Sequence, residues 1–198
     1  MHAMIVIATI ELVSGLAQTD VTLADRVMRE GTDIAVTVNV DGPPVTLEHM
    51  LKATDLVIRG TIGTITGHLS DDGREIYRTY ELMGPRVLFA AEVPQLAVPG
   101  MPTALTFRQP GGTVTIGTHT ATITYDILAN PREGMDVVLL LSSYDGRNEP
   151  AAAIGIFEVR EGLRIASSSP LPGEHHQFDG MNVDEFVDKV LAARMAIR

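Results

Sequence analysis

The stretch "EHHQFD", residues 174–179, contains the side chains closest in type to those of a metal centre. Imidazole and carboxylate groups are common zinc ligands, so His175, His176 and Asp179, with Glu174 as a further donor, could support metal-assisted hydrolysis. Adjacent histidines on an extended chain point to opposite faces, which keeps them from reaching one ion. The segment also follows the polar, proline-rich run "SSSPLPG", and a solvated loop is the competing interpretation that the sequence favours.

A second group lies in "GHLSDDGREIYRTYELM", residues 67–83, where His68, Asp71 and Asp72 offer oxygen and nitrogen donors. Calcium takes about six to eight oxygen ligands, and here the two acids are adjacent in a loop of only a few residues. Serine, aspartate and glycine between two β-prone runs are also the residues of a hairpin turn. We therefore predict a turn, followed by a strand in which Tyr77 and Tyr80 face opposite sides.

A third group combines Ser142 or Ser143 with Asp145, as in a hydrolase that activates a serine. No pattern in the chain brings a histidine within reach of these serines, as general-base activation requires. Asp145-Gly146 is typical of a turn at the end of a strand. The GxSxG, HExxH, P-loop and GxGxxG motifs are absent from the sequence, so we predict no catalytic residue and no cofactor.

The composition restricts the class of partner. The 198 residues carry a formal charge of −10, with two lysines and scattered arginines, whereas nucleic-acid binding needs clustered Lys and Arg. The absence of cysteine excludes disulfides and thiolate chemistry, and a hydrophobic content of 45% is ordinary for a globular domain. These properties disfavour nucleic acid and leave an unknown protein or small ligand as the partner.

The first 20 residues allow two interpretations. "AMIVIATIELVSGLAQ" resembles a secretory leader with a cleavage region before Gln18, but it lacks a positive start and contains Glu11. The apolar run is too short for a transmembrane helix, which needs roughly 20 residues. Export and a cytoplasmic location both remain open, since a buried N-terminal strand or a misassigned start codon explains the pattern as well.

The elements predicted along the rest of the chain are mainly strands. Residues 21–54 read as helix, strand and helix, with Thr22, Asp25 and Gly31 as the caps of the first helix. From residue 55 to 167 short β runs alternate with glycine turns, including Gly111-Gly112 as a hairpin turn and a hairpin that turns at Glu161-Gly162. Residues 168–198 are a loop and an amphipathic helix capped by Asn182. We predict a mainly β, α+β fold in which residues 55–167 form a small β-barrel and residues 21–198 one domain.

The order of these segments resembles that of known proteins over about residues 20–167. "LEHMLKATDLVIRG", "PGGTVTI", "VVLLLSS" and "AAIGIFEVREGLRI" are similar to segments of a group of bacterial proteins without an assigned activity, many of them exported. The helix followed by "DLVIRG" is more remotely similar to netrin-like domains, which include the tissue inhibitors of metalloproteinases. This resemblance implies an oligonucleotide/oligosaccharide-binding (OB) type of barrel and an extracytoplasmic location. Those domains depend on disulfides and the inhibitors on an N-terminal cysteine, so inhibition is not carried over to this chain.

The sequence therefore predicts a non-enzymatic binding module of OB-like or netrin-like type. One alternative is a metal-assisted hydrolase that uses His175, His176 and Asp179. The other is an oligonucleotide-binding barrel, which the acidic charge disfavours.

Overall fold

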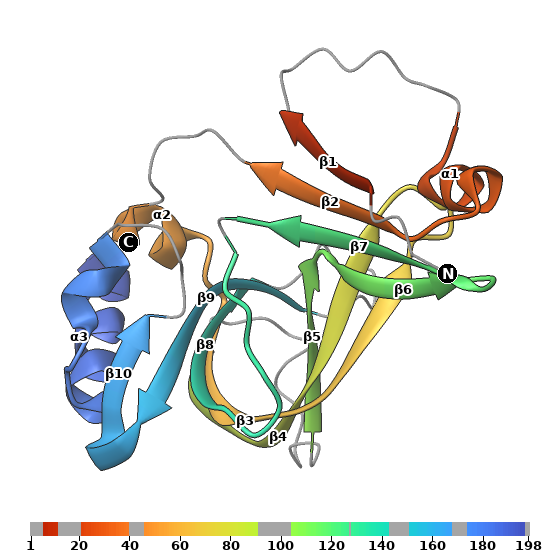
Figure 1. Cartoon of the computed structure of the whole chain (residues 1–198). Coiled ribbons are helices and arrows are strands. Elements are labelled where there is room, and N and C mark those ends of the chain that lie inside the picture. Colours follow the sequence, from red (N-terminus) through yellow and green to blue (C-terminus); the bar gives the residue numbers. More distant parts are fainter. Residues whose placement is uncertain are drawn as a thin grey trace. The chain divides into compact units, whose positions relative to one another are not determined.

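The computed structural model describes residues 6–11, 21–39, 46–90, 104–126, 128–142, 151–167 and 174–196 (Figure 1). Its strands form a four-stranded sheet in the order β1-β2-β7-β6 and a six-stranded sheet in the order β10-β9-β5-β4-β3-β8. The mainly β, α+β class predicted from the sequence is confirmed. The elements are β1 (Val6–Glu11), α1 (Leu23–Glu30), β2 (Ile34–Asn39), α2 (Leu47–Lys52), β3 (Leu56–Leu69), β4 (Ile76–Ala90), β5 (Ala104–Pro110), β6 (Gly112–Ile116), β7 (His119–Tyr125), β8 (Asp136–Ser142), β9 (Ala151–Arg160), the 3-10 helix η1 (Glu161–Leu163), β10 (Arg164–Ser167), the 3-10 helix η2 (Glu174–Phe178) and α3 (Val183–Ala196).

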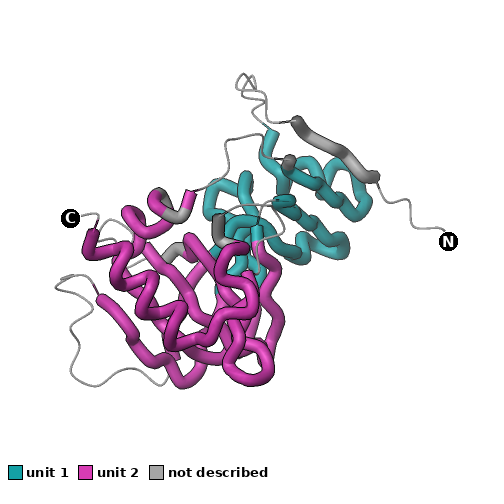
Figure 2. Tube along the Cα trace, turned by 90° about the vertical axis from the view of Figure 1, so that its left-hand side faces the viewer, with its two compact units in different colours: residues 1–42, 66–79, 109–128 teal, residues 43–65, 80–108, 129–198 magenta. Residues whose placement is uncertain are grey.

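The chain divides into two compact units, each assembled from three separate segments (Figure 2). Unit 1 comprises residues 1–42, 66–79 and 109–128, and unit 2 comprises residues 43–65, 80–108 and 129–198. The long strands β3 and β4 contribute residues to both units.

Unit 1 is built on the four-stranded sheet. β1 and β7 both pair with β2 in parallel, and β6 pairs with β7 in antiparallel orientation. Ile34, Val36 and Val38 alternate along β2 and are buried, as the period of two in the sequence predicts. They form a core with Val27 of α1 and Ile76 of β4, so the helix and the start of β4 pack on one face of this sheet.

The caps predicted for α1 are confirmed in detail. The Thr22 hydroxyl accepts a hydrogen bond from the Asp25 N–H at 3.0 Å, and the Thr22 N–H donates to the Asp25 carboxylate at 3.3 Å. Gly31 ends the helix in the left-handed conformation, with φ of +60°. These local contacts satisfy backbone groups that the helix itself leaves unpaired.

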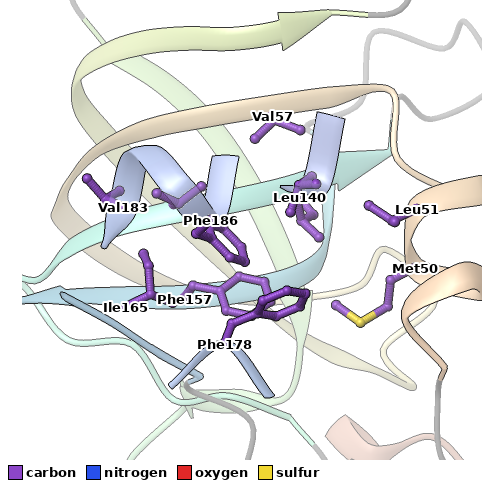
Figure 3. Close-up of a cluster of buried hydrophobic side chains, with 11 residues drawn as sticks. Met50, Leu51, Val57, Leu140, Phe157, Ile165, Phe178, Val183 and Phe186 are labelled. Carbon is purple, nitrogen blue, oxygen red and sulfur yellow. The ribbon is translucent and has the colours of Figure 1, made fainter. Parts of the chain in front are cut away.

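Unit 2 contains two layers of buried side chains. The first layer receives residues from β3, β4, β5, β8 and β9, and it consists of Leu56, Ile58, Ile62, Tyr80, Leu82, Phe107, Ala129, Val137, Leu139, Leu141 and Ile156. The second layer, called here the helix layer, lies between the other face of the strands and the helices (Figure 3). Phe186 of α3 contacts Phe157 of β9 there, and Met50 and Leu51 of α2 complete it.

Strands β6 and β7 differ from the prediction. The sequence pattern predicts both strands in the barrel with the others after residue 55, whereas they pair in the sheet of β1 and β2. The predicted hairpin turn at Gly111-Gly112 is also wrong, because β5 and β6 belong to different sheets. Gly111 has a φ of +86° and Gly112 one of +125°, and a Cβ on Gly111 would lie 2.8 Å from the Ile123 carbonyl oxygen. The two glycines therefore let the chain lead from β5 in one sheet to β6 in the other, at a point where a side chain would collide with its neighbours.

Candidate functional site

The turn at Ser70-Asp71-Asp72-Gly73 joins β3 to β4, as predicted. The Gly73 N–H donates to the Ser70 carbonyl at 2.8 Å, and Gly73 has a φ of +69°. The Ser70 hydroxyl lies 2.6 Å from the Asp72 carboxylate, which also accepts from the Arg74 N–H at 3.1 Å. These two hydrogen bonds lower the pKa of Asp72. The Asp72 carboxylate thus stabilises the turn through these hydrogen bonds.

His68 and Asp71 do not join Asp72 in a metal-binding group. The His68 ring stacks on Tyr77 across the hairpin, with centroids 5.1 Å apart and an interplanar angle of 19°. Tyr77 is half-buried and Tyr80 fully buried, which agrees with their predicted opposite faces. Among the described residues no three His, Asp, Glu or Cys side chains are grouped closely enough to hold a metal ion.

His176 and Asp179 do come together, through the 3-10 helix η2. The His176 Nδ1 atom lies 2.9 Å from one carboxylate oxygen of Asp179, and the Ser167 N–H donates to the other oxygen at 2.6 Å. The sequence favours a solvated loop here, and the divergence expected of His175 and His176 applies only to an extended chain. The compact 3-10 turn instead places residues three apart on one side.

The Asp179 carboxylate links η2 to the edge of β10. Partial burial raises the pKa of Asp179, but the hydrogen bonds from Ser167 and His176 outweigh it and leave this pKa below its ordinary value. The following backbone continues the link, because the Gly180 N–H donates to the Ile165 carbonyl at 2.7 Å and the Ile165 N–H donates to the Met181 carbonyl at 2.8 Å. The histidine–carboxylate pair therefore fastens a segment that runs along the outer edge of β10.

The other residues predicted for a site are not brought together in the part of the chain that the structure describes. Ser142 ends β8, while Ser143 and Asp145 lie outside the described residues, as does the side chain of His175. The Ser167 group that contacts Asp179 is a backbone N–H, which is no nucleophile. The contacts around Asp179 can orient an imidazole, as carboxylates hydrogen-bonded to catalytic or metal-bound histidines do in enzymes, but they also suffice as a structural clasp.

A small surface over β3, β4 and β5 was not predicted from the sequence. Thr61, Met83 and Thr106 are all exposed, and each stands next to a buried residue on one of these three neighbouring strands. We call them the outer face. The Met83 side chain lies across Gly63, where a Cβ would come within 2.9 Å of its Cγ, and 44% of Met83 remains exposed. The sequence signal for this face is Gly63 within β3, which leaves room for the side chain of Met83 on the neighbouring strand.

No protein-family model, curated protein or solved structure matches this chain. Within the ranges that the structure describes, none of the helices has the length and apolar character needed to cross a membrane.

Proposed function

We propose that this chain is a non-enzymatic binding module and that unit 2 is a closed OB-type barrel. The observation that carries the proposal is the pairing of β8 with both β3 and β9. The sheet order already links β9, β5, β4 and β3 as neighbours. Together with the two pairings of β8, this gives a closed cycle of paired strands in the order β3-β4-β5-β9-β8. The first core layer of unit 2, to which all five strands contribute, supports the same arrangement.

The direction of the strands also supports an OB-type topology. β5 pairs with β9 in parallel, whereas β3 with β8 and β8 with β9 are antiparallel. A five-stranded barrel of Greek-key type closes with this mixture of directions, and it binds ligands over its second and third strands. In unit 2 these strands are β4 and β5, which carry Met83 and Thr106 of the outer face. Fold alone does not define a ligand, so the class of ligand is argued from this face.

The proposed ligand of the outer face is another protein. Thr61, Met83 and Thr106 present methyl, thioether and hydroxyl groups without charge, and methionine adapts to irregular apolar surfaces. Nucleic acid would require a basic face, and the chain has a net charge of −10. Salt-sensitive binding of single-stranded DNA at micromolar protein concentration would replace this proposal by the oligonucleotide-binding one.

Site-specific photo-crosslinking tests the outer face. A photoreactive residue replaces Met83 in the full chain, and a matched variant carries it at Met195, an exposed position on α3. In cells of the native host we expect a protein adduct from position 83 that is reduced when Thr61 and Thr106 are both changed to arginine. Absence of an adduct at 83, or equal adducts at 83 and 195, would contradict the proposal.

The metal-assisted hydrolase remains an alternative because His176 and Asp179 lie 2.9 Å apart. Zinc analysis of tag-free protein separates it from the binding module. Stoichiometric zinc that is lost from both H175A and H176A variants would favour the hydrolase. Zinc below stoichiometry, unchanged by either substitution, favours the structural clasp.

We further propose export to the cell envelope or medium, on the basis of the N-terminal pattern and the resemblance to exported bacterial proteins. Residues 6–11 form β1 at the edge of the four-stranded sheet, so cleavage before Gln18 would leave β2 as that edge. Mass spectrometry of the protein from its native host tests this, with a mature N-terminus near Gln18 expected. An intact Met1 on a cytosolic product would exclude export.

A further inference from the structure

The turn between β9 and β10 contains a backbone conformation that its side chain disfavours. Gly162 has a φ of +69° and Leu163 a φ of +56°, the pattern of positive φ typical of a type I′ hairpin turn. Leu163 is the only non-glycine residue with positive φ among those that the structure describes. For a residue with a Cβ, this conformation lowers the folding equilibrium constant by roughly 5- to 30-fold.

Burial does not fully compensate for this cost. Leu163 is 44% exposed, whereas the leucines of the core are almost completely buried. Glycine or asparagine at position 163 would adopt the same turn more readily. The turn geometry therefore does not explain why an apolar, β-carbon-bearing residue occupies its tip.

The arginines at the base of the turn are also placed unfavourably. Arg160 and Arg164 are directly opposite each other in the β9–β10 pair, where like charges repel. The Arg160 Nε atom contacts Glu158 at 2.9 Å, yet 63% of the Arg160 side chain is exposed. Arg164 donates from Nη1 to the Gly180 carbonyl at 2.8 Å, and the turn also includes the exposed Glu161. Each guanidinium has five N–H donors, of which these contacts use one, so the two arginines at the base of the turn keep donors for a partner beside the exposed leucine.

We propose that the tip, residues 160–164, is a docking site for a second protein, separate from the outer face. Leu163 enters an apolar socket of that protein, and Arg160 and Arg164 donate hydrogen bonds to carboxylate or carbonyl oxygens at its rim. Locally unfavourable features persist where function requires them, and a buried anchor ringed by polar contacts is the usual form of a binding hot spot. An anionic membrane is the poorer occupant, because the chain is acidic and Glu161 lies between the arginines.

Stability measurements on L163G and L163N test whether the fold itself needs Leu163. If Leu163 serves binding, both variants keep the folding equilibrium constant of the original protein or raise it several-fold, because the turn is relieved. A fivefold or greater loss in both variants would mean that Leu163 is needed for packing inside the chain. That result would overturn the proposal without reference to any partner.

Crosslinking with competition tests whether the tip binds another protein through Leu163. A photoreactive residue at position 163 is compared with one at Met28, which is 62% exposed on α1. In native-host cells we expect one discrete adduct with another protein from position 163 and none from position 28. Excess original protein should suppress this adduct at least tenfold more effectively than L163G. Equal suppression by L163G, an adduct with a second copy of the chain or with lipid, or no adduct would each overturn the proposal, whatever the outcome for Met83.

Discussion

Truncating Phe186 to alanine tests whether α3 is an integral part of unit 2. Phe186 is fully buried, and its ring centroid lies 4.7 Å from that of Phe157 and 5.1 Å from that of Phe178. Removing a buried phenylalanine costs about 3–5 kcal/mol, and losing two aromatic neighbours favours the upper part of this range. For a chain of this size the loss corresponds to a fall in Tm of roughly 6–20 °C.

Urea unfolding of F186A beside two reference variants measures this loss. F186L retains most of the apolar volume and should lose less than half as much free energy of unfolding. D188A changes an exposed position of the same helix and should stay within about 0.5 kcal/mol of the original protein. Hydrogen exchange should show faster exchange in α3 and β9 of F186A. A loss below about 1 kcal/mol, or one equal to that of D188A, would refute the view that the helix layer stabilises unit 2.

Three further substitutions test single contacts. G67A should lower the free energy of unfolding, measured in urea, by about 1–3 kcal/mol, because its Cβ would meet the Thr113 carbonyl oxygen. An unchanged free energy of unfolding would mean that β3 and β6 do not approach each other there. D179A should cost about 1 kcal/mol at pH 7, allowing for solvent exposure. Because the pKa of Asp179 is lower in the folded state, its contribution to stability is present above the unfolded pKa of about 3.9 and is lost as the pH falls through the folded pKa. The difference in stability between D179A and the original protein should therefore vanish in acid. A difference that stays constant with pH would contradict this. A double-mutant cycle on Arg59 and Asp136, whose Nη2 and Oδ2 atoms lie 2.7 Å apart, should give a coupling near 1 kcal/mol, and zero coupling would contradict the pairing.

The predictions that succeeded concern contacts between near neighbours in the chain. The capping box of Thr22 and Asp25 involves residues three apart, and the burial of one side of β2 follows from strand alternation. Pairing between distant strands is not encoded in this way. The sequence of β7 is compatible with either sheet, and its parallel pairing with β2 depends on residues more than 80 positions apart.

The candidate sites show the same division between local and distant information. The turn at Ser70–Gly73 was predictable because its hydrogen bonds lie within six residues. His176 and Asp179 were grouped from the sequence only as metal ligands, and a solvated loop was favoured over that group, because nothing local predicted the 3-10 helix that brings the two side chains together. For Leu163 the sequence predicted a hairpin turn at Glu161-Gly162, but only the backbone reveals that the leucine itself has positive φ.

The packing of unit 2 restricts where any ligand can bind. Tyr80, Phe107 and Leu139 are fully buried in its first core layer, and the proposed barrel of five strands would enclose too little space for side chains of this size and a ligand together. A small molecule inside the proposed barrel would have to displace these side chains, at a cost of several kcal/mol for each large one. Binding to this unit must therefore use its loops or the outward sides of its strands. Met83 and Leu163, exposed apolar residues on an outward strand face and on a turn, meet that condition without any change in the core.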